Sequence, residues 1–206
     1  MNVEALLELE EEYDDYAKLC KCGMRTVLAR IENLQEEMDL SDERNIYDII
    51  ESRIKDFDSV LEKLERKGLE KNIDAIKQNI RDIAGIRIVT LFKDDIYKIR
   101  DALVKQPSME ILEERDYVAE PKKNGYRSLH LIVSMHIYFR ERSISIPVEI
   151  QIRTKAMDLW ASIEHHCRYK NDNPSEKAPE AFSRIAKILD EFDEEAIGLR
   201  DCTPTT

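Results

Sequence analysis

The segment Ile144 to Arg153, with the sequence ISIPVEIQIR, carries the clearest structural signal in the chain. Its apolar side chains recur at every second position, which is typical of a half-buried strand with one face against a core. Glu149, Gln151 and Arg153 must then share the opposite face, about 7 Å apart at a rise of roughly 3.3 Å per residue. A carboxylate, an amide and a guanidinium in one row suit the binding of a metal ion and a phosphate group. A ladder of salt bridges to neighbouring strands would explain the same pattern without a function.

The composition limits the class of protein. The chain has 206 residues, enough for one well-packed domain with helical extensions and too few for two large ones. Charged residues make up 36% of the sequence and the formal net charge is −11, so the surface as a whole repels polyanions. We therefore expect no stable complex with nucleic acid, although regulation by RNA stays open. A nucleotide site also stays open, because it depends on local cations and on Mg²⁺.

Targeting and redox features indicate the cytoplasm. No apolar run approaches the roughly 20 residues that span a bilayer, and the acidic N-terminal segment lacks the basic start of a signal peptide. We expect a cytoplasmic protein that does not bind membranes. The four cysteines form neither a C-x-x-C pair nor a disulfide framework, so we expect reduced thiols. A zinc site at the adjacent His165, His166 and Cys167 is disfavoured, because side chains diverge around a helix.

Hydrophobic periodicity divides the chain into helical ends and a mixed centre. Helices are predicted over residues 3–38 with a break near Gly23, 52–67 ending at Gly68, 71–79, 95–104, 154–169 with Thr154 as cap, and 180–199. Strands are predicted over residues 86–91, 110–115, 128–138 and 144–153. The order predicts an α/β fold, a mixed sheet flanked by helices. We divide it into an N-terminal helical extension (1–40), a central domain (41–170), and a C-terminal helix and tail after a polar linker (171–206).

One side of the helix predicted over residues 52–67 is cationic. A helical wheel places four polar side chains, which we call the cationic row, opposite the apolar ones: Lys55, Ser59, Lys63 and Arg66. Arg53 lies just before this row and could extend it. Such a row could hold a triphosphate, but an amphipathic helix with an ordinary solvated face explains it equally well.

Two acidic residues are candidates for a metal site. Asp82 comes just before a predicted strand, in the run RDIAGIRI, where a turn-forming Asp is the simpler explanation. Glu149 lies on a different strand. An octahedral Mg²⁺ takes one or two protein carboxylates and fills its other positions with water and phosphate oxygens. The two acids together therefore predict a Mg²⁺ site.

The loop KKNGYRSLH, residues 122–130, combines basic side chains with an aromatic one next to a glycine. The face of Tyr126 could stack on a nucleobase, an interaction of about 1–3 kcal/mol. A tyrosine buried in the core is the alternative. The glycine before it favours the close approach of a ligand.

Three runs together resemble the synthetase domain of the RelA/SpoT alarmone enzymes, and specifically the small stand-alone synthetases. The runs are RDIAGIRI (81–88), ERDYVAEPKKNGYRSLH (114–130) and VEIQIRTKAMDLWASIEHHCRYK (148–170), and the match is dense over residues 47–170. The resemblance implies a nucleotidyltransferase-like fold, with residues 41–170 as the synthetase domain. It also implies a GTP pyrophosphokinase of the stringent response, which transfers the β,γ-pyrophosphate of ATP to the 3′-hydroxyl of GTP or GDP and releases AMP.

The resemblance implies roles for individual residues. Arg53 and Arg87 would hold the adenine between them, and the cationic row would bind the ATP phosphates. Asp82 and Glu149 would bind Mg²⁺, and Glu149 would also orient or deprotonate the attacking hydroxyl. The residues implied to contact GTP or GDP or the transferring phosphates are Lys122, Tyr126, His130, Gln151 and Arg115, of which His130 and Arg115 would be catalytic.

One position departs from the family pattern. Asp158 stands where some members have an asparagine that recognises guanine. A carboxylate can accept hydrogen bonds from the guanine N1–H and N2–H₂ groups, so we expect Asp158 to contact the base as well.

The resemblance also bears on activity and assembly. Larger members add a His-Asp hydrolase domain, whereas this chain has four histidines and no H-D pair, which predicts synthesis without hydrolysis. The acidic, amphipathic terminal helices resemble those that assemble small synthetases into homotetramers. Two alternatives stay open: an enzyme that pyrophosphorylates the 3′ end of tRNA, which the net charge disfavours, and a non-catalytic nucleotide- or RNA-binding module, which the two acids disfavour.

Overall fold

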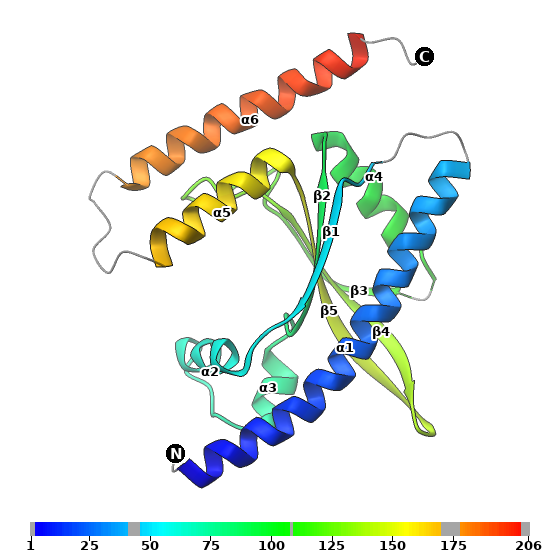
Figure 1. The fold of residues 1–206 in the computed structure, drawn as a ribbon, viewed down its shortest axis with the longest axis vertical. Helices are drawn as coiled ribbons and strands as arrows, with labels where there is room; N and C mark the ends of the chain where they lie inside the picture. The colour runs from blue at the N-terminus through cyan, green and yellow to red at the C-terminus, as the bar shows by residue number, and fades with distance from the viewer. Residues whose placement is uncertain (1–2, 41–45, 108, 170–177, 203–206) are drawn as a thin grey trace.

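The fold is built on one five-stranded mixed sheet with the spatial order β1-β2-β5-β4-β3 (Figure 1). The computed structural model describes residues 3–40, 46–107, 109–169 and 178–202. β2 and β5 are parallel at the centre, and the other neighbouring strands are antiparallel. The predicted mixed α/β fold is confirmed. The strands are β1 (Ile49–Ile54), β2 (Ala84–Thr90), β3 (Met109–Asp116), β4 (Leu129–Phe139) and β5 (Arg142–Thr154).

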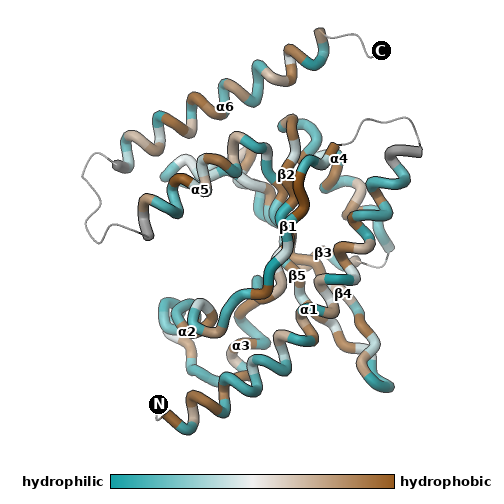
Figure 2. Tube along the Cα trace, viewed as in Figure 1, coloured by the Kyte–Doolittle hydropathy of each residue, from teal (hydrophilic) through white to brown (hydrophobic). Residues whose placement is uncertain are grey.

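The helices of the described residues lie around this sheet. Figure 1 shows α1 running diagonally across one side and α6 lying over α5 on the other. Figure 2 shows apolar and polar residues alternating along α1 and α6, as expected for helices with one apolar side. Among the described helices, none is both long and apolar enough to cross a membrane. The helices are α1 (Val3–Leu40), α2 (Phe57–Arg66), α3 (Ile73–Asn79), α4 (Lys93–Val104), α5 (Lys155–Tyr169) and α6 (Ala178–Cys202).

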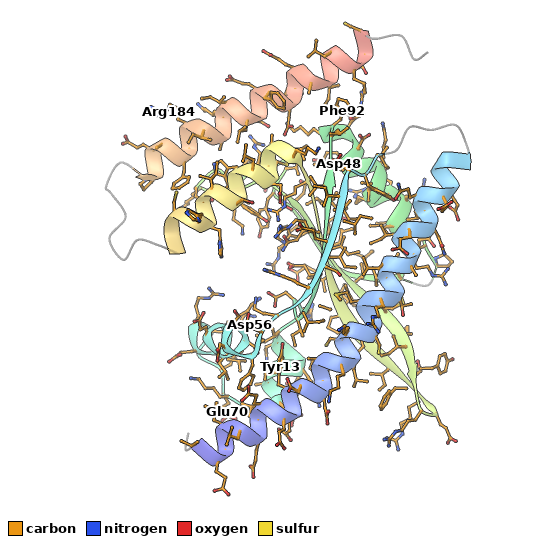
Figure 3. All side chains as sticks on the ribbon, viewed as in Figure 1. Tyr13, Asp48, Asp56, Glu70, Phe92 and Arg184 are labelled. Atoms are coloured by element: carbon orange, nitrogen blue, oxygen red, sulfur yellow. The ribbon has the colours of Figure 1, made fainter. Side chains whose placement is uncertain are left out.

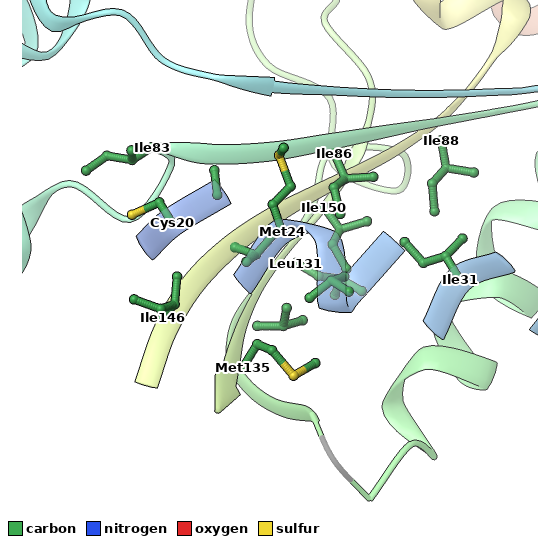
Figure 4. Packing of buried hydrophobic residues seen from close by; sticks show 14 of the residues in the cluster. Cys20, Met24, Ile31, Ile83, Ile86, Ile88, Leu131, Met135, Ile146 and Ile150 are labelled. Carbon is green, nitrogen blue, oxygen red and sulfur yellow. The ribbon is translucent and has the colours of Figure 1, made fainter. Parts of the chain in front are cut away.

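The core lies between the sheet and α1, with α4 beside it. Alternate residues of the central strands point toward α1, so their opposite neighbours are left on the other face. α1 belongs to the same core as the sheet, because its side chains are buried in one cluster with those of the strands. Figure 4 shows this contact through Cys20, Met24 and Ile31 of α1, Ile86 and Ile88 of β2, Leu131 and Met135 of β4, and Ile146 and Ile150 of β5.

The break predicted near Gly23 is wrong, because α1 continues without interruption through this position. A Cβ added to Gly23 would lie only 2.8 Å from Cγ2 of Ile146. The glycine therefore permits the close crossing of α1 over β5 instead of ending the helix.

The helix predicted over residues 52–67 is wrong in its first part. Residues 49–54 form strand β1, and α2 begins only at Phe57, after the N-cap Asp56, whose side chain accepts a hydrogen bond from the Ser59 N–H. Asp56 and Tyr13 are labelled in Figure 3, and the Tyr13 hydroxyl donates to the carbonyl of Lys55 just before this cap. The predicted stop is confirmed, since Gly68 follows the helix with φ +66°.

The remaining elements agree closely with the predicted boundaries. The predicted cap of α5 is confirmed, because the Thr154 hydroxyl accepts a hydrogen bond from the Met157 N–H at 3.1 Å. α6 packs on α5 and α4 and starts at residue 178. Most of the predicted polar linker, residues 171–177, lies outside the described residues.

Candidate active site

The strand register brings polar side chains from all five strands onto the sheet face opposite α1. Residues paired directly across neighbouring strands point to the same face, so each set of paired positions forms a row across the sheet. One row contains Glu51, Arg87, Gln151, His130 and Arg115. The adjacent row contains Arg53, Gly85, Glu149, Ile132 and Glu113. The second face predicted for the segment 144–153 therefore continues over the whole sheet.

Asp82 lies between α3 and β2 and is held by two lysines. Its Oδ2 accepts hydrogen bonds from Lys63 Nζ at 2.6 Å and from Lys55 Nζ at 3.2 Å. Burial acts to raise the pKa of Asp82, but the hydrogen bonds and charges of the two lysines outweigh it, so the pKa is lowered. The other oxygen, Oδ1, is buried and has no hydrogen-bond partner among the described residues. Asp82 is therefore an ionised carboxylate with one oxygen left for a ligand.

Glu149 lies on β5 and has a partner for each carboxylate oxygen. Oε1 lies 3.1 Å from Nδ1 of His130, and Oε2 accepts a hydrogen bond from Nε2 of Gln151 at 2.9 Å. Burial acts to raise the pKa of Glu149, but the contacts with His130 and Gln151 outweigh it and the pKa is lowered. The charge of Asp82 acts in the opposite direction, as expected for two carboxylates that share one site.

Asp82 and Glu149 lie where two cavities meet. The first cavity, of about 390 Å³, extends over β1 and β2 and is lined by Arg53 and Arg87 as well as by the two acids. The second, of about 370 Å³, extends toward α2, α3 and β3. Its other charged lining residues are Lys63, Lys67, Arg81, Glu113, Arg115 and His130.

A third cavity, of about 650 Å³, lies next to α5. It shares Arg53, Arg87 and Gln151 with the first cavity and is also lined by Tyr126. The three cavities share lining residues and so adjoin one another on the polar face of the sheet, and we call them together the groove. The residues of β1, β2 and β5 that line these cavities and that the sequence analysis had singled out are Arg53, Arg87, Glu149, Gln151 and Arg153.

The cationic row does not act as one unit. Lys63 on α2 and Lys55, which precedes the helix, both reach Asp82. Ser59 instead donates its hydroxyl hydrogen to Asp56 Oδ2 at 2.9 Å, within the cap of α2. Arg66 is exposed in the last turn of the helix. The structure thus brings half of the predicted row to the acidic pair.

Asp158 lies between two guanidinium groups. Its Oδ1 is 3.1 Å from Nε of Arg153, whose side chain is 3% exposed, and 3.6 Å from Nη1 of Arg87. Arg87 also pairs with Glu51 on β1 at 3.0 Å. Asp158 is not among the residues that line the three cavities, and its carboxylate orients arginines that do line them.

The predicted acceptor residues of the loop come together at the edge of the groove. The Tyr126 hydroxyl lies 2.8 Å from Nε2 of His130. Lys122 Nζ lies 4.6 Å from the centroid of the Tyr126 ring and 4.5 Å from that of Tyr117, which places the ammonium between the two rings. The Trp160 ring of α5 meets Tyr126 edge-on, with the centroids 6.3 Å apart.

α6 supports this loop from behind. Gly125 has φ +92°, and a Cβ at this position would lie 2.5 Å from Cβ of Ala186 on α6. Arg127 donates to the carbonyl of Val118 and to Asp190 of α6, both at 2.7 Å. The position of Tyr126 therefore depends on a helix far away in the sequence.

Several lining residues were missed by sequence reasoning. Lys67 lies one helical turn after Lys63, so the helical wheel could have found it. Glu51 was missed because strand β1 was not predicted: its last residues were assigned to the helix 52–67 and its first residues to no element. His165 and His166 line the third cavity. They belong to residues 148–170, one of the three runs that resemble the family, and this resemblance could have indicated them. Arg81, between α3 and β2, and Glu113 of β3 come together across the fold, and no local pattern in the sequence indicates that approach.

Comparison with known proteins explains this arrangement. A family model described as a region found in RelA/SpoT proteins matches residues 52–174. The chain belongs to the RelA/SpoT family. Within this family it is 35% identical to the GTP pyrophosphokinase YwaC of Bacillus subtilis, over 97% of this chain and 95% of that protein.

Solved structures of RelA/SpoT proteins share the fold. The crystal structure of the small alarmone synthetase 1 from Bacillus subtilis, bound to its product pppGpp, has a TM-score of 0.84 at 30% identity and covers 93% of this chain and 97% of that chain. The small alarmone synthetase 2 from the same organism has a TM-score of 0.84 at 33% identity and covers 93% of this chain and 100% of that one. The resemblance to the small stand-alone synthetases is thus confirmed over nearly the whole chain.

Proposed function

We propose that this protein is a (p)ppGpp synthetase, which transfers the β,γ-pyrophosphate of ATP to the 3′-hydroxyl of GTP or GDP and releases AMP. The observation that carries this proposal is the meeting of two ionised carboxylates, Asp82 and Glu149, at the junction of two cavities. Each cavity also contains cationic side chains suited to phosphates. A donor and an acceptor nucleotide could therefore approach the acidic pair from two directions.

The donor side suits ATP. Arg53 and Arg87 come from neighbouring strands and face the same two cavities, so planar guanidinium groups are available on either side of an adenine. Gly85, which pairs with Arg53, leaves room beside it. In this proposal Lys55 and Lys63 hold the phosphates, and Ser59 and Arg66 of the cationic row extend the contact along α2.

Asp82 and Glu149 fit a Mg²⁺ ion. The buried Oδ1 of Asp82 has no hydrogen-bond partner among the described residues, which is what a metal ligand requires before the metal binds. When bound, Mg²⁺ would neutralise the phosphate charge that develops during transfer. The supporting chemistry is that Mg²⁺ takes one or two protein carboxylates and completes its coordination with water and phosphate oxygens.

The acceptor side suits GTP or GDP. The Tyr126 ring would stack on guanine, with Lys122 and Gln151 beside it, while Arg115 and His130 would contact the transferring phosphates. The guanine contact of Asp158 stays a prediction, because its carboxylate pairs with Arg87 and Arg153 in this structure.

In the reaction, the acceptor 3′-oxygen forms a bond to the β-phosphorus of ATP. The bond from that phosphorus to the oxygen bridging the α- and β-phosphates breaks, and AMP leaves with this oxygen. Glu149 would orient the 3′-hydroxyl and accept its proton. A carboxylate of lowered pKa is a weak base, but phosphoryl transfer depends mainly on positioning and charge stabilisation.

The acceptor assay tests the proposal. Purified protein is incubated with γ-labelled ATP and Mg²⁺, and GTP, GDP, GMP, ATP or tRNA is offered separately. We expect label in GTP and GDP, and loss of activity when a chelator removes Mg²⁺. Label in tRNA alone would replace the proposal with the tRNA-modifying alternative. Incubation with ppGpp alone tests the expected lack of hydrolysis.

We further propose that the protein is a cytoplasmic homotetramer. The support is an exposed apolar stripe on α6, since Ile188, Phe192 and Leu199 are 55%, 60% and 72% exposed and lie on one side of the helix. Light scattering coupled to size-exclusion chromatography measures the assembly. A monomer at micromolar concentration would overturn this part of the proposal.

A further inference from the structure

A chain of two hydrogen bonds joins Tyr126 to Glu149. The Tyr126 hydroxyl oxygen lies 2.8 Å from His130 Nε2, and His130 Nδ1 lies 3.1 Å from Glu149 Oε1. Tyr126 lies in the loop before β4, His130 on β4 and Glu149 on β5. The side chains of His130 and Glu149 are 13% and 17% exposed, so water competes little for these bonds.

With the imidazole of His130 neutral, the chemistry of the groups fixes the direction of both bonds. A carboxylate can only accept hydrogen bonds, so the contact with Glu149 requires a hydrogen on Nδ1 of His130. In a neutral imidazole Nε2 then carries no hydrogen and accepts. The Tyr126 hydroxyl is the group that donates to it. Glu149 therefore selects this tautomer, and the Tyr126 hydroxyl completes the chain by donating to the Nε2 that the tautomer leaves without a hydrogen.

We propose that the Tyr126 hydroxyl is a positioning group for pyrophosphate transfer, which acts through His130 to hold Glu149 against the acceptor 3′-hydroxyl. The inference rests on the proposed function and deepens it. Stacking on guanine needs only the ring of Tyr126, whereas positioning needs only its hydroxyl. One side chain thus couples the presence of the acceptor base to the geometry of the catalytic carboxylate.

The surroundings leave His130 little other means of keeping this orientation. The rings of Tyr117 and Tyr126 meet the imidazole edge-on, with centroids 5.3 and 5.8 Å away, and limit its position but supply no tautomer preference. Without the hydroxyl, Nε2 loses its partner and the imidazole can turn, so its Nδ1–H no longer holds Oε1 of Glu149 in place. A displacement of the carboxylate by a fraction of an ångström would be enough to slow transfer.

The substitution Tyr126→Phe separates the two roles. We expect kcat to fall by about 10- to 100-fold, the usual effect of removing a group that orients a catalytic ligand. KM for GTP and for ATP should change by less than about threefold, because the ring and the ATP site are intact. Tyr126→Ala should show the same loss of kcat and in addition raise KM for GTP by roughly 5- to 150-fold, the equivalent of about 1–3 kcal/mol of stacking.

A matched control and a double-mutant cycle complete the test. Tyr97→Phe removes another hydroxyl that bonds a side chain, Asp116 at 3.1 Å, and should leave kcat and both KM values unchanged. If the hydroxyl acts through His130, Tyr126→Phe should have no further effect on kcat in a His130→Ala background.

Three outcomes would overturn the inference. The first is an unchanged kcat in Tyr126→Phe. The second is a raised KM for GTP with a normal kcat, which would mean that the hydroxyl contacts the acceptor directly. The third is additive losses of kcat in the double mutant. Failure of the proposed function would look different, since the wild type itself would then label neither GTP nor GDP.

Discussion

Asp82 and Glu149 could be predicted as site residues from the sequence, but their charge state could not. Both acids were identified from the sequence, because Asp82 stands just before a predicted strand and Glu149 lies on the polar face of another. Their ionised state could not be predicted in the same way. It depends on Lys55 and Lys63 for Asp82, and on His130 and Gln151 for Glu149. The packing of α2 brings Lys63 to Asp82, and the register of β4 with β5 brings His130 to Glu149. Sequence thus predicts the ligands, and tertiary structure decides their charge.

The substitution Glu149→Gln tests the metal assignment. It keeps the size of the side chain and removes the charge that a metal ion and the attacking hydroxyl require, so we expect turnover to fall by at least ~10³. Turnover is measured as (p)ppGpp formation, with the melting temperature recorded alongside. Glu110→Gln, at an exposed carboxylate on β3, is the control and should be silent. A loss below tenfold in a folded Glu149→Gln protein would reject the assignment.

At the scale of elements, strand β1 and the start of α2 could not be predicted from the sequence. The segment IIESRI has no strict alternation of apolar and polar residues, and it lies directly before a strongly amphipathic helix. It is a strand because it pairs with β2, an interaction between residues such as Ile49 and Val89 that lie far apart in the sequence and that no local pattern encodes. The same pairing places Arg53 in the groove, whereas the wheel had placed it on a helix.

The cationic row can be tested one side chain at a time. Lys63→Ala should lower kcat/KM for ATP by about 10- to 150-fold, as expected for loss of a hydrogen bond to a charged group worth about 1.5–3 kcal/mol. Arg66→Ala should have a smaller effect, because Arg66 is exposed and does not line either cavity at the acidic pair. Both variants should stay folded, since the apolar side of α2 is unchanged and Lys55 still bonds Asp82 when Lys63 is replaced.

Glu62→Ala is the control on the same helix, because Glu62 is exposed and lies beside the cationic row without being part of it. A Lys63→Ala protein that unfolds without a specific defect in ATP use would favour the ordinary amphipathic helix.

At the scale of the whole molecule, α6 is fixed to the sheet domain by buried polar contacts. The Thr154 hydroxyl donates to Asp193 Oδ2 at 2.7 Å, and both side chains are almost fully buried. Lys93 pairs with Asp190 at 2.9 Å, and Arg200 with Asp94 at 2.8 Å. Amphipathic periodicity predicted α6 itself. It could not predict these contacts, because they join residues about 40 to more than 100 positions apart.

Asp193 should make stability depend on pH. Burial raises the pKa of Asp193 from 3.8 to about 6, against the opposing effects of the Thr154 hydrogen bond and the Lys93 charge. The folded state therefore binds the proton more tightly than the unfolded state. This contribution is complete below pH 3.8 and is lost as the pH rises through about 6.

We expect Asp193→Asn to be more stable than the wild type at pH 8, by up to about 3 kcal/mol, because it keeps an acceptor for Thr154 without a buried charge. The advantage should vanish near pH 4. Denaturant unfolding at both pH values measures it, and Glu191→Gln, at an exposed carboxylate of α6, is the control. An equal difference at both pH values would contradict the role of the buried charge.

The parallel pairing of β2 with β5 also has a consequence for the order of folding. β4 and β5 are joined by a tight turn at Arg140, so their hairpin closes quickly. β2 meets β5 only after α4, β3 and β4 have been arranged between them, and closure of so long a loop is slow. Asp82 and Glu149 approach each other through this pairing. We therefore expect the catalytic centre to assemble late, with amides of β2 protected after those of the hairpin in pulse-labelled hydrogen exchange. A newly synthesised chain would then hold a formed hairpin well before it can make its first product.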